Sequence, residues 1–257
     1  MTKIITLIGI LLFIGCSTKP ELESSCFDYA SLKQQIESSK ITFILSEGTF
    51  GNVNGGLWGV KDNSIQQLPG NPTGNTSTSM VIHNDNLYIV NNVSATMLKY
   101  EISDLGVVKP TCESLDLNGS SPREILVIND KAYISQWNVY GIAVIDLPSF
   151  TKTNTIPVNG HTEGLAFDGT HLFAAIAYDD YSEYSSGSSL VKINLTSNSV
   201  EKEIQVSDNP QQLIFHDGYI YVSSIQYGDW PDPNSYSTEK IDPVSDKVVA
   251  FEYYGNT

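Results

Sequence analysis

Leu165-Ala-Phe-Asp-Gly-Thr-His-Leu-Phe173 reads as an apolar strand, a tight Asp/Gly turn and a second apolar strand. Three other segments align with it without gaps: Met80-Val-Ile-His-Asn-Asp-Asn-Leu-Tyr88, Ile125-Leu-Val-Ile-Asn-Asp-Lys-Ala-Tyr133 and Leu213-Ile-Phe-His-Asp-Gly-Tyr-Ile-Tyr221. Their closing aromatic residues are 45, 40 and 48 positions apart. A turn of Asn, Asp or Gly between two apolar runs is typical of a β-hairpin. The sequence therefore predicts a hairpin that recurs every 40 to 48 residues.

Two more strands follow each hairpin. The third strands are expected at 97–101, 142–146, 190–194 and 238–242, and the fourth at 113–117, 152–158, 200–206 and 247–252. Four short strands per repeat form a sheet too small to bury both faces alone, so neighbouring sheets must stack. This pattern predicts an all-β chain, a β-propeller of four-stranded blades. The irregular strands of a β-sandwich would not keep this register.

The repeat divides the chain into a leader and tether, 1–15 and 16–40, and a propeller over 41–257. The expected blades are 41–68, 69–117, 118–158, 159–206 and 207–257. The first blade lacks its innermost strand. Residues 32–36 are expected to form at most a short helical turn.

The N-terminus has the pattern of an export signal. Lys3 precedes a nearly unbroken apolar run from Ile4 to Ile14, which is too short to span a bilayer permanently. The run ends in Phe13-Ile14-Gly15-Cys16, which resembles the lipoprotein box of bacteria, in which the Cys is acylated. This resemblance implies a lipid anchor at Cys16, in the bacterial cell envelope at the outer membrane, on its periplasmic side or its surface. The alternative is an ordinary leader with a coincidental Cys.

Two further cysteines, Cys26 and Cys112, remain after such a leader. An exported protein lies in an oxidising compartment, where the two thiols can pair. A disulfide between them and two unpaired thiols are both compatible with the sequence.

The chain is strongly acidic, with 14 Lys and Arg against 29 Asp and Glu and a formal charge of −15. Such a surface repels phosphate backbones, which argues against a nucleic-acid partner. Cations, cationic proteins and neutral ligands are compatible with this charge.

The blade motifs resemble a known family. Repeated Leu-Tyr-Ile/Val, Val144-Ile-Asp146 and Thr155-Ile-Pro-Val-Asn-Gly160 are similar to the YncE-like seven-bladed propellers. Ser46-Glu-Gly-Thr-Phe-Gly-Asn-Val-Asn-Gly-Gly56 resembles the first blade of their surface-lipoprotein branch in Bacteroidetes-type bacteria. The resemblance covers about residues 41–257 and implies seven blades. The similar proteins include cobalamin-binding propellers, but no motif in this sequence indicates cobalamin binding. The resemblance leaves a truncated seven-bladed ring and a closed five-bladed ring as alternatives.

No catalytic constellation is evident. The CxxCH, GxSxG, P-loop and HExxH motifs are absent, and no catalytic, metal or cofactor residues are predicted. Thr78, Arg123, Glu163 and Gln211 begin the expected inner strands, and one carboxylate beside one Arg is a poor metal cage. A metal-dependent, lactonase-like hydrolase using Glu163 is the enzymatic alternative. Calcium at Asp179, Asp180 and Glu183 is less favoured than a solvated acidic loop.

The loops that join second to third strands carry the strongest functional signal. They are expected at 91–96, 136–140, 178–187 and 226–236, on the same face as the blade crossings. Aromatic rings with polar tips are common in recognition surfaces, although ordinary blade packing is the alternative for each ring. The predicted ligand-binding residues are Trp137, Tyr140, Tyr178, Tyr181, Tyr227 and Trp230, with Arg123, Glu163 and Gln211. The sequence thus favours a non-catalytic propeller that binds a small ligand, corrinoid-like or sugar, or an envelope protein. A structural or protein-docking propeller at the cell surface is the further alternative.

Overall fold

The computed structural model describes residues 41–61, 64–68, 71–102, 108–180, 185–226 and 235–254. Within these ranges the chain forms strands, turns and bends and no helix. The described part therefore contains no helix that is long and apolar enough to cross a membrane. Cys16, Cys26 and the expected helical turn at 32–36 lie outside the described residues. The prediction of a pair between Cys26 and Cys112 stays a prediction.

In the described ranges, nineteen strands form five antiparallel sheets, each built from strands that are consecutive in the chain, and we number these sheets as blades 1 to 5. Blade 1 contains β1 (Thr42–Ser46), β2 (Gly56–Lys61) and β3 (Ser64–Gln67). Blade 2 contains β4 (Ser77–His83), β5 (Asn86–Asn91), β6 (Thr96–Ile102) and β7 (Val108–Asp116). Blade 3 contains β8 (Pro122–Ile128), β9 (Lys131–Gln136), β10 (Gly141–Asp146) and β11 (Thr151–Pro157).

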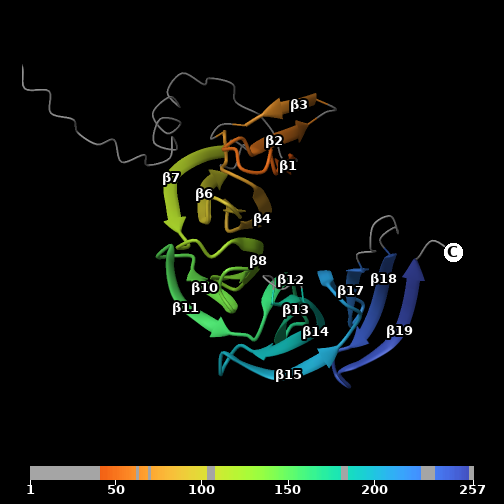
Figure 1. Ribbon diagram of the computed structural model, residues 1–257. Coiled ribbons are helices and arrows are strands. Elements are labelled where there is room, and N and C mark those ends of the chain that lie inside the picture. Colours follow the sequence, from red (N-terminus) through yellow and green to blue (C-terminus); the bar gives the residue numbers. More distant parts are fainter. Residues whose placement is uncertain are drawn as a thin grey trace, which may run out of the picture.

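The remaining two blades follow the same plan. Blade 4 contains β12 (His161–Phe167), β13 (His171–Asp180), β14 (Ser185–Asn194) and β15 (Ser199–Gln205). Blade 5 contains β16 (Pro210–His216), β17 (Tyr219–Gln226), β18 (Ser235–Asp242) and β19 (Lys247–Tyr254). The blades lie side by side along an arc with the first strand of blades 2 to 5 innermost (Figure 1). The fold is a β-propeller of four-stranded blades, which confirms the fold predicted from the repeat.

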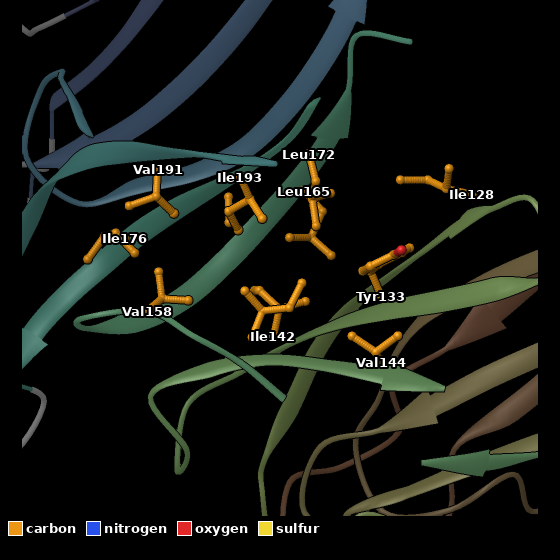
Figure 2. Packing of buried hydrophobic residues seen from close by; sticks show 12 residues of the cluster. Ile128, Tyr133, Ile142, Val144, Val158, Leu165, Leu172, Ile176, Val191 and Ile193 are labelled. Carbon is orange, nitrogen blue, oxygen red and sulfur yellow. The ribbon is translucent and has the colours of Figure 1, made fainter. Parts of the chain in front are cut away.

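Hydrophobic cores lie between consecutive blades, because strand side chains alternate between the two faces of each sheet. Between blades 3 and 4, for example, Tyr133, Ile142 and Val144 meet Leu172 and Ile193, all of them buried (Figure 2). Three similar clusters join blades 1 and 2, blades 2 and 3, and blades 4 and 5. Each buried Leu, Ile or Phe stabilises the stack by roughly 1.5–3 kcal/mol. Stacking, rather than any single sheet, therefore holds the molecule together.

No such cluster joins blades 1 and 5 within the described ranges. Blade 1 has three strands here, and β1 pairs with β2 alone among the described strands. The long β1–β2 connection, residues 47–55, corresponds to the connections between second and third strands elsewhere. The described residues thus form an open arc rather than a closed five-bladed ring (Figure 1).

Several strands extend beyond their expected ends. β13 continues through Asp180 and β14 begins at Ser185, so Tyr178 and Asp179 are strand residues rather than loop residues. β7 begins at Val108 instead of 113. The expectation was wrong at these ends because it followed apolar side chains, whereas backbone hydrogen bonds continue a ladder through polar residues as well.

Candidate ligand-binding site between blades 3 and 4

The inner strands share an irregularity at their start. The pairing register shifts between Ser77 and Ser79, Pro122 and Ile125, Thr162 and Leu165, and Pro210 and Gln212. Thr78, Arg123, Glu163 and Gln211, which the sequence singled out, therefore occupy bulges. A β-bulge bends the strand and re-aims a side chain away from its regular direction. This explains how polar residues stand at the start of strands whose later residues are apolar.

Arg123 and Glu163 form an ion pair that joins blade 3 to blade 4. Arg123 Nε lies 2.9 Å from both Glu163 oxygens, and Nη2 lies 2.8 Å from Oε1. The carboxylate also accepts a hydrogen bond from Trp137 Nε1 at 2.6 Å. Glu163 is 5% exposed, so these three donors replace water around a buried charge. The pair holds the two blades in one relative position at this face.

Trp137 contacts Arg123, Glu163 and Tyr178. It lies at the start of the β9–β10 connection, and the Arg123 guanidinium stacks over its ring at 4.4 Å from the centroid. Tyr178 of β13 meets the indole edge-on, with 5.7 Å between ring centroids and an interplanar angle of 80°. The indole thus links a cation, a carboxylate and a second aromatic ring.

Tyr140 and His161 extend the cluster outward. The two rings meet edge-on, with 4.8 Å between centroids, and His161 Nδ1 is hydrogen-bonded to the Trp137 carbonyl. Tyr140 donates its hydroxyl proton to the Asp179 carbonyl at 3.1 Å. Because the Tyr140 side chain is 46% exposed although its hydroxyl is held, its ring is a fixed aromatic surface that faces solvent.

Glu124 is a second acid at the same blade junction. Its carboxylate accepts a hydrogen bond from the Leu165 backbone N–H at 2.8 Å, at the bulge of β12. The pKa of Glu124 is raised from 4.5 to about 7, mainly because the carboxyl is buried; the Leu165 N–H opposes this shift, and the nearby Glu163 charge adds to it. Glu124 therefore takes up a proton close to neutral pH.

Gly164 lets the inner strands of blades 4 and 5 approach closely. A Cβ atom at this position would lie 2.4 Å from the Gln211 carbonyl oxygen and 2.8 Å from the Leu213 nitrogen. The Gln211 amide is turned back onto Asn209, at 2.6 Å from Asn209 Oδ1. Gln211 therefore does not join the polar cluster, although the sequence analysis grouped it with Arg123 and Glu163.

The structure brings together five of the predicted binding residues: Arg123, Glu163, Trp137, Tyr140 and Tyr178. Tyr181, Tyr227 and Trp230 lie outside the described residues. Sequence reasoning missed His161 and Glu124. Each is within two positions of a residue that it did single out, and that proximity was the available signal.

The enzymatic alternative has little geometric support. Both Glu163 oxygens are occupied by Arg123 and Trp137, which leaves this carboxylate poorly placed to bind a metal ion. In the described ranges, no three His, Cys, Asp or Glu side chains gather in a way that suits a metal. The arrangement at this junction consists of a buried ion pair and aromatic rings.

No protein-family model matches the chain, and no curated protein matches it. Solved structures do match. Hydrazine synthase of Kuenenia stuttgartiensis is similar with a TM-score of 0.57 and 16% identity, over 70% of this chain and 49% of that one. Dihydro-heme d1 dehydrogenase NirN is similar with a TM-score of 0.56 and 16% identity, over 82% of this chain and 45% of that one. The WD40 β-propeller domain of Doa1 is similar with a TM-score of 0.57 and 11% identity, over 83% of this chain and 65% of that one.

The chain spans about half the length of the hydrazine synthase and NirN chains. At these identities the likeness shows the fold alone. The comparisons therefore support a β-propeller and leave the activity to be argued from the site.

Proposed function

We propose that this chain is a non-catalytic, ligand- or partner-binding β-propeller whose binding site is the cluster between blades 3 and 4. The observation that carries the proposal is the Arg123–Glu163 pair held against Trp137, with Tyr140 fixed and exposed beside it. Ligand sites of this kind combine rigid aromatic surface with a few convergent polar groups. Both are supplied here by two rigid blades.

The charge balance of the cluster indicates the type of ligand. Arg123 and Glu163 neutralise each other, so the junction carries no strong net charge, while the whole chain carries −15. A large polyanion is repelled by this surface. A neutral ligand with one flat or apolar side, such as a sugar or a corrinoid-like ring, fits the Tyr140 ring, as does a cationic segment of an envelope protein.

A thermal-shift screen of the purified chain against corrinoids, sugars and peptides tests the proposal. Any ligand found is then titrated against Tyr140→Ala, which we expect to weaken binding by about 1–3 kcal/mol. Phe50→Ala is the matched control, since Phe50 is 76% exposed on the β1–β2 connection of blade 1. Equal loss in both variants, or in neither, would reject the junction as the binding site.

We further propose that the chain is an envelope lipoprotein of the YncE-like group, anchored through acylated Cys16. The support is the leader and lipoprotein box in the sequence, together with a propeller fold. Cells that express the chain should incorporate a palmitate analogue into it. A Cys16→Ala chain that still takes up the label would refute the anchor while leaving the binding proposal intact.

A further inference from the structure

Two adjacent residues of β8 both reach blade 4, although side chains normally alternate between the two faces of a strand. Arg123 binds Glu163, and Glu124 accepts a hydrogen bond from the Leu165 backbone N–H at 2.8 Å. Arg123 and Glu124 lie in the bulge of β8, where its pairing with β9 shifts register. A bulge re-aims a side chain in this way. It therefore brings a second acid to the junction that already holds the Arg123–Glu163 pair.

This junction contains two carboxyl groups and one guanidinium. Glu163 accepts hydrogen bonds from Arg123 Nε and Nη2 and from Trp137 Nε1. In the described part of the chain, the Glu124 carboxyl accepts one hydrogen bond, from the Leu165 N–H. Two carboxylates that share a partly buried site repel each other, so one of them binds a proton more readily. Glu163 is the better stabilised anion, and Glu124 is therefore the acid that takes up the proton.

The strands packed against β8 are β4, β5, β9 and β12, and in the described ranges none of them pairs a cation with Glu124. Lys131 of β9 is paired with Ile128 at the opposite end of β8, and His83 of β4 bonds to Asp130 at the hairpin turns. The other titratable side chains on these four strands are Tyr88, Tyr133, His161 and Glu163. Among these, the Glu163 charge acts on the pKa of Glu124 and raises it.

Arg123 connects the charge of Glu124 to the aromatic residues of the site. Its guanidinium lies 4.4 Å from the centroid of the Trp137 ring, and its side chain is 23% exposed, so it is not enclosed on all sides. A charged Glu124 competes with Glu163 for this guanidinium, because charge-assisted hydrogen bonds are the stronger ones.

We propose that Glu124 is a proton-controlled switch of the blade 3–4 site: release of its proton to solvent draws the Arg123 guanidinium away from the Trp137 ring and weakens ligand binding. The inference rests on the proposed function, because the switch regulates that same site. A proton shifts such an equilibrium because it binds only one of the two arrangements.

The pH range of the switch follows from the pKa of Glu124, which burial raises to about 7. Below this pH the acid is neutral, and Arg123 serves Glu163 alone. Above it the junction carries an additional negative charge. Ligand affinity should therefore fall as pH rises through about 7. By linkage, a ligand that prefers the protonated arrangement moves the proton release to higher pH.

The fluorescence of Trp137 tests the switch without a ligand. The chain has three Trp residues, so Trp58→Phe and Trp230→Phe together leave Trp137 as the reporter. Acrylamide quenching of this full-length chain is measured from about pH 5 to about pH 9, which brackets the proton release of Glu124. Glu124→Gln and Glu124→Ala are then introduced separately, since both are uncharged at every pH. His161→Gln is the matched control, because His161 is titratable and bonds to the Trp137 carbonyl.

We expect one transition centred at about pH 7, with stronger quenching on its alkaline side because the guanidinium no longer covers the indole. Both Glu124 variants should lose the transition, and His161→Gln should keep it, while circular dichroism verifies that each variant keeps its strands. A flat pH profile in the reporter chain overturns the proposal. A transition that survives in either Glu124 variant, or that disappears in His161→Gln, overturns it as well.

The outcome of this measurement is independent of the ligand screen. A flat profile removes the switch and leaves the proposed binding function in place. A chain that shows the transition of Glu124 but binds no ligand or partner keeps the proton-dependent movement and rejects the proposed function.

Discussion

One face of the propeller carries the hairpin turns, and the other carries the blade crossings and the longer connections. The carboxylates of Asp146 and Asp242 on the first face have different kinds of partner from those of Glu163 and Glu124 on the second. On the turn face, Asp146 and Asp242 accept hydrogen bonds from Ser149 and Ser245 within their own turns, which lowers the pKa of both carboxyls. On the crossing face, Glu163 and Glu124 accept hydrogen bonds from another blade. Asp146 and Asp242 thus fix the shape of their own turns, whereas Glu163 and Glu124 join blades 3 and 4, and Asp130 of the turn face joins blades 2 and 3 by accepting a hydrogen bond from Asn84.

Among the substitutions that compare the two faces, removal of the Glu163 carboxylate should cause the largest loss in the free energy of unfolding. Glu163→Ala leaves Arg123 and Trp137 Nε1 without their acceptor at a buried junction, so we expect a loss of about 3 kcal/mol in the free energy of unfolding, measured with urea. Asp217→Asn on the turn face is the comparison, because Asp217 is exposed and Asn tolerates its φ of 48°. Equal losses in the two variants would remove the distinction between the faces. Replacing Arg123 and Glu163 together by Leu should recover part of the stability.

Two glycines give a second test. Gly164→Ala forces a Cβ against the Gln211 backbone, and we expect it to cost roughly 2–3 kcal/mol. Gly218 of the turn face has open space around it but a φ of +80°, so Gly218→Ala should cost about 1 kcal/mol through backbone strain. Thermal unfolding compares the two. A smaller loss at Gly164 would mean that the inner strands of blades 4 and 5 separate easily.

The pH dependence of stability should have opposite signs on the two faces. The folded chain holds the Glu124 proton up to about pH 7, whereas the unfolded chain releases it near its ordinary value of 4.5. The contribution of Glu124 to stability is therefore greatest at low pH and falls as pH rises from about 4.5 to 7. Glu124→Gln should abolish this fall and raise the free energy of unfolding at pH 8 by about 2 kcal/mol relative to the unmodified chain.

Asp146→Asn is the matched control, since its lowered pKa acts in the opposite direction. Asp146 stabilises above its unfolded pKa, and this contribution is lost as pH falls through its folded pKa. Urea unfolding between pH 3 and 8 separates the two cases. If the unmodified chain and Glu124→Gln show parallel pH profiles, Glu124 is not protonated in the folded state near neutral pH.

The smallest effect is expected within the turns. Asp217 has a φ of 48° and precedes Gly218, so Asp217→Gly should change stability by no more than about 0.5 kcal/mol, because both residues adopt this conformation. Ligand binding at the blade 3–4 junction should be unchanged in this variant. A binding defect would place ligand recognition on the turn face instead of the crossing face.

The sequence by itself determined the repeat, the four strands of each full blade and the two faces. These features follow from local chemistry: Asn, Asp and Gly at tight turns, alternating apolar residues in strands, and the need of a small sheet to stack. It also singled out Arg123, Glu163, Trp137, Tyr140 and Tyr178 as individual residues, without indicating which of them meet.

Only the tertiary structure decided which of these residues contact one another. Arg123 and Glu163 are forty residues apart and pair because bulges at the start of β8 and β12 turn both side chains toward the same junction. Gln211 occupies the equivalent bulge of β16, yet its amide bonds to Asn209 of its own blade. The repeat assigns these residues equivalent positions but not partners. A partner depends on how closely two blades stack and on which side chain the next blade presents there, and neither property is encoded in any one repeat.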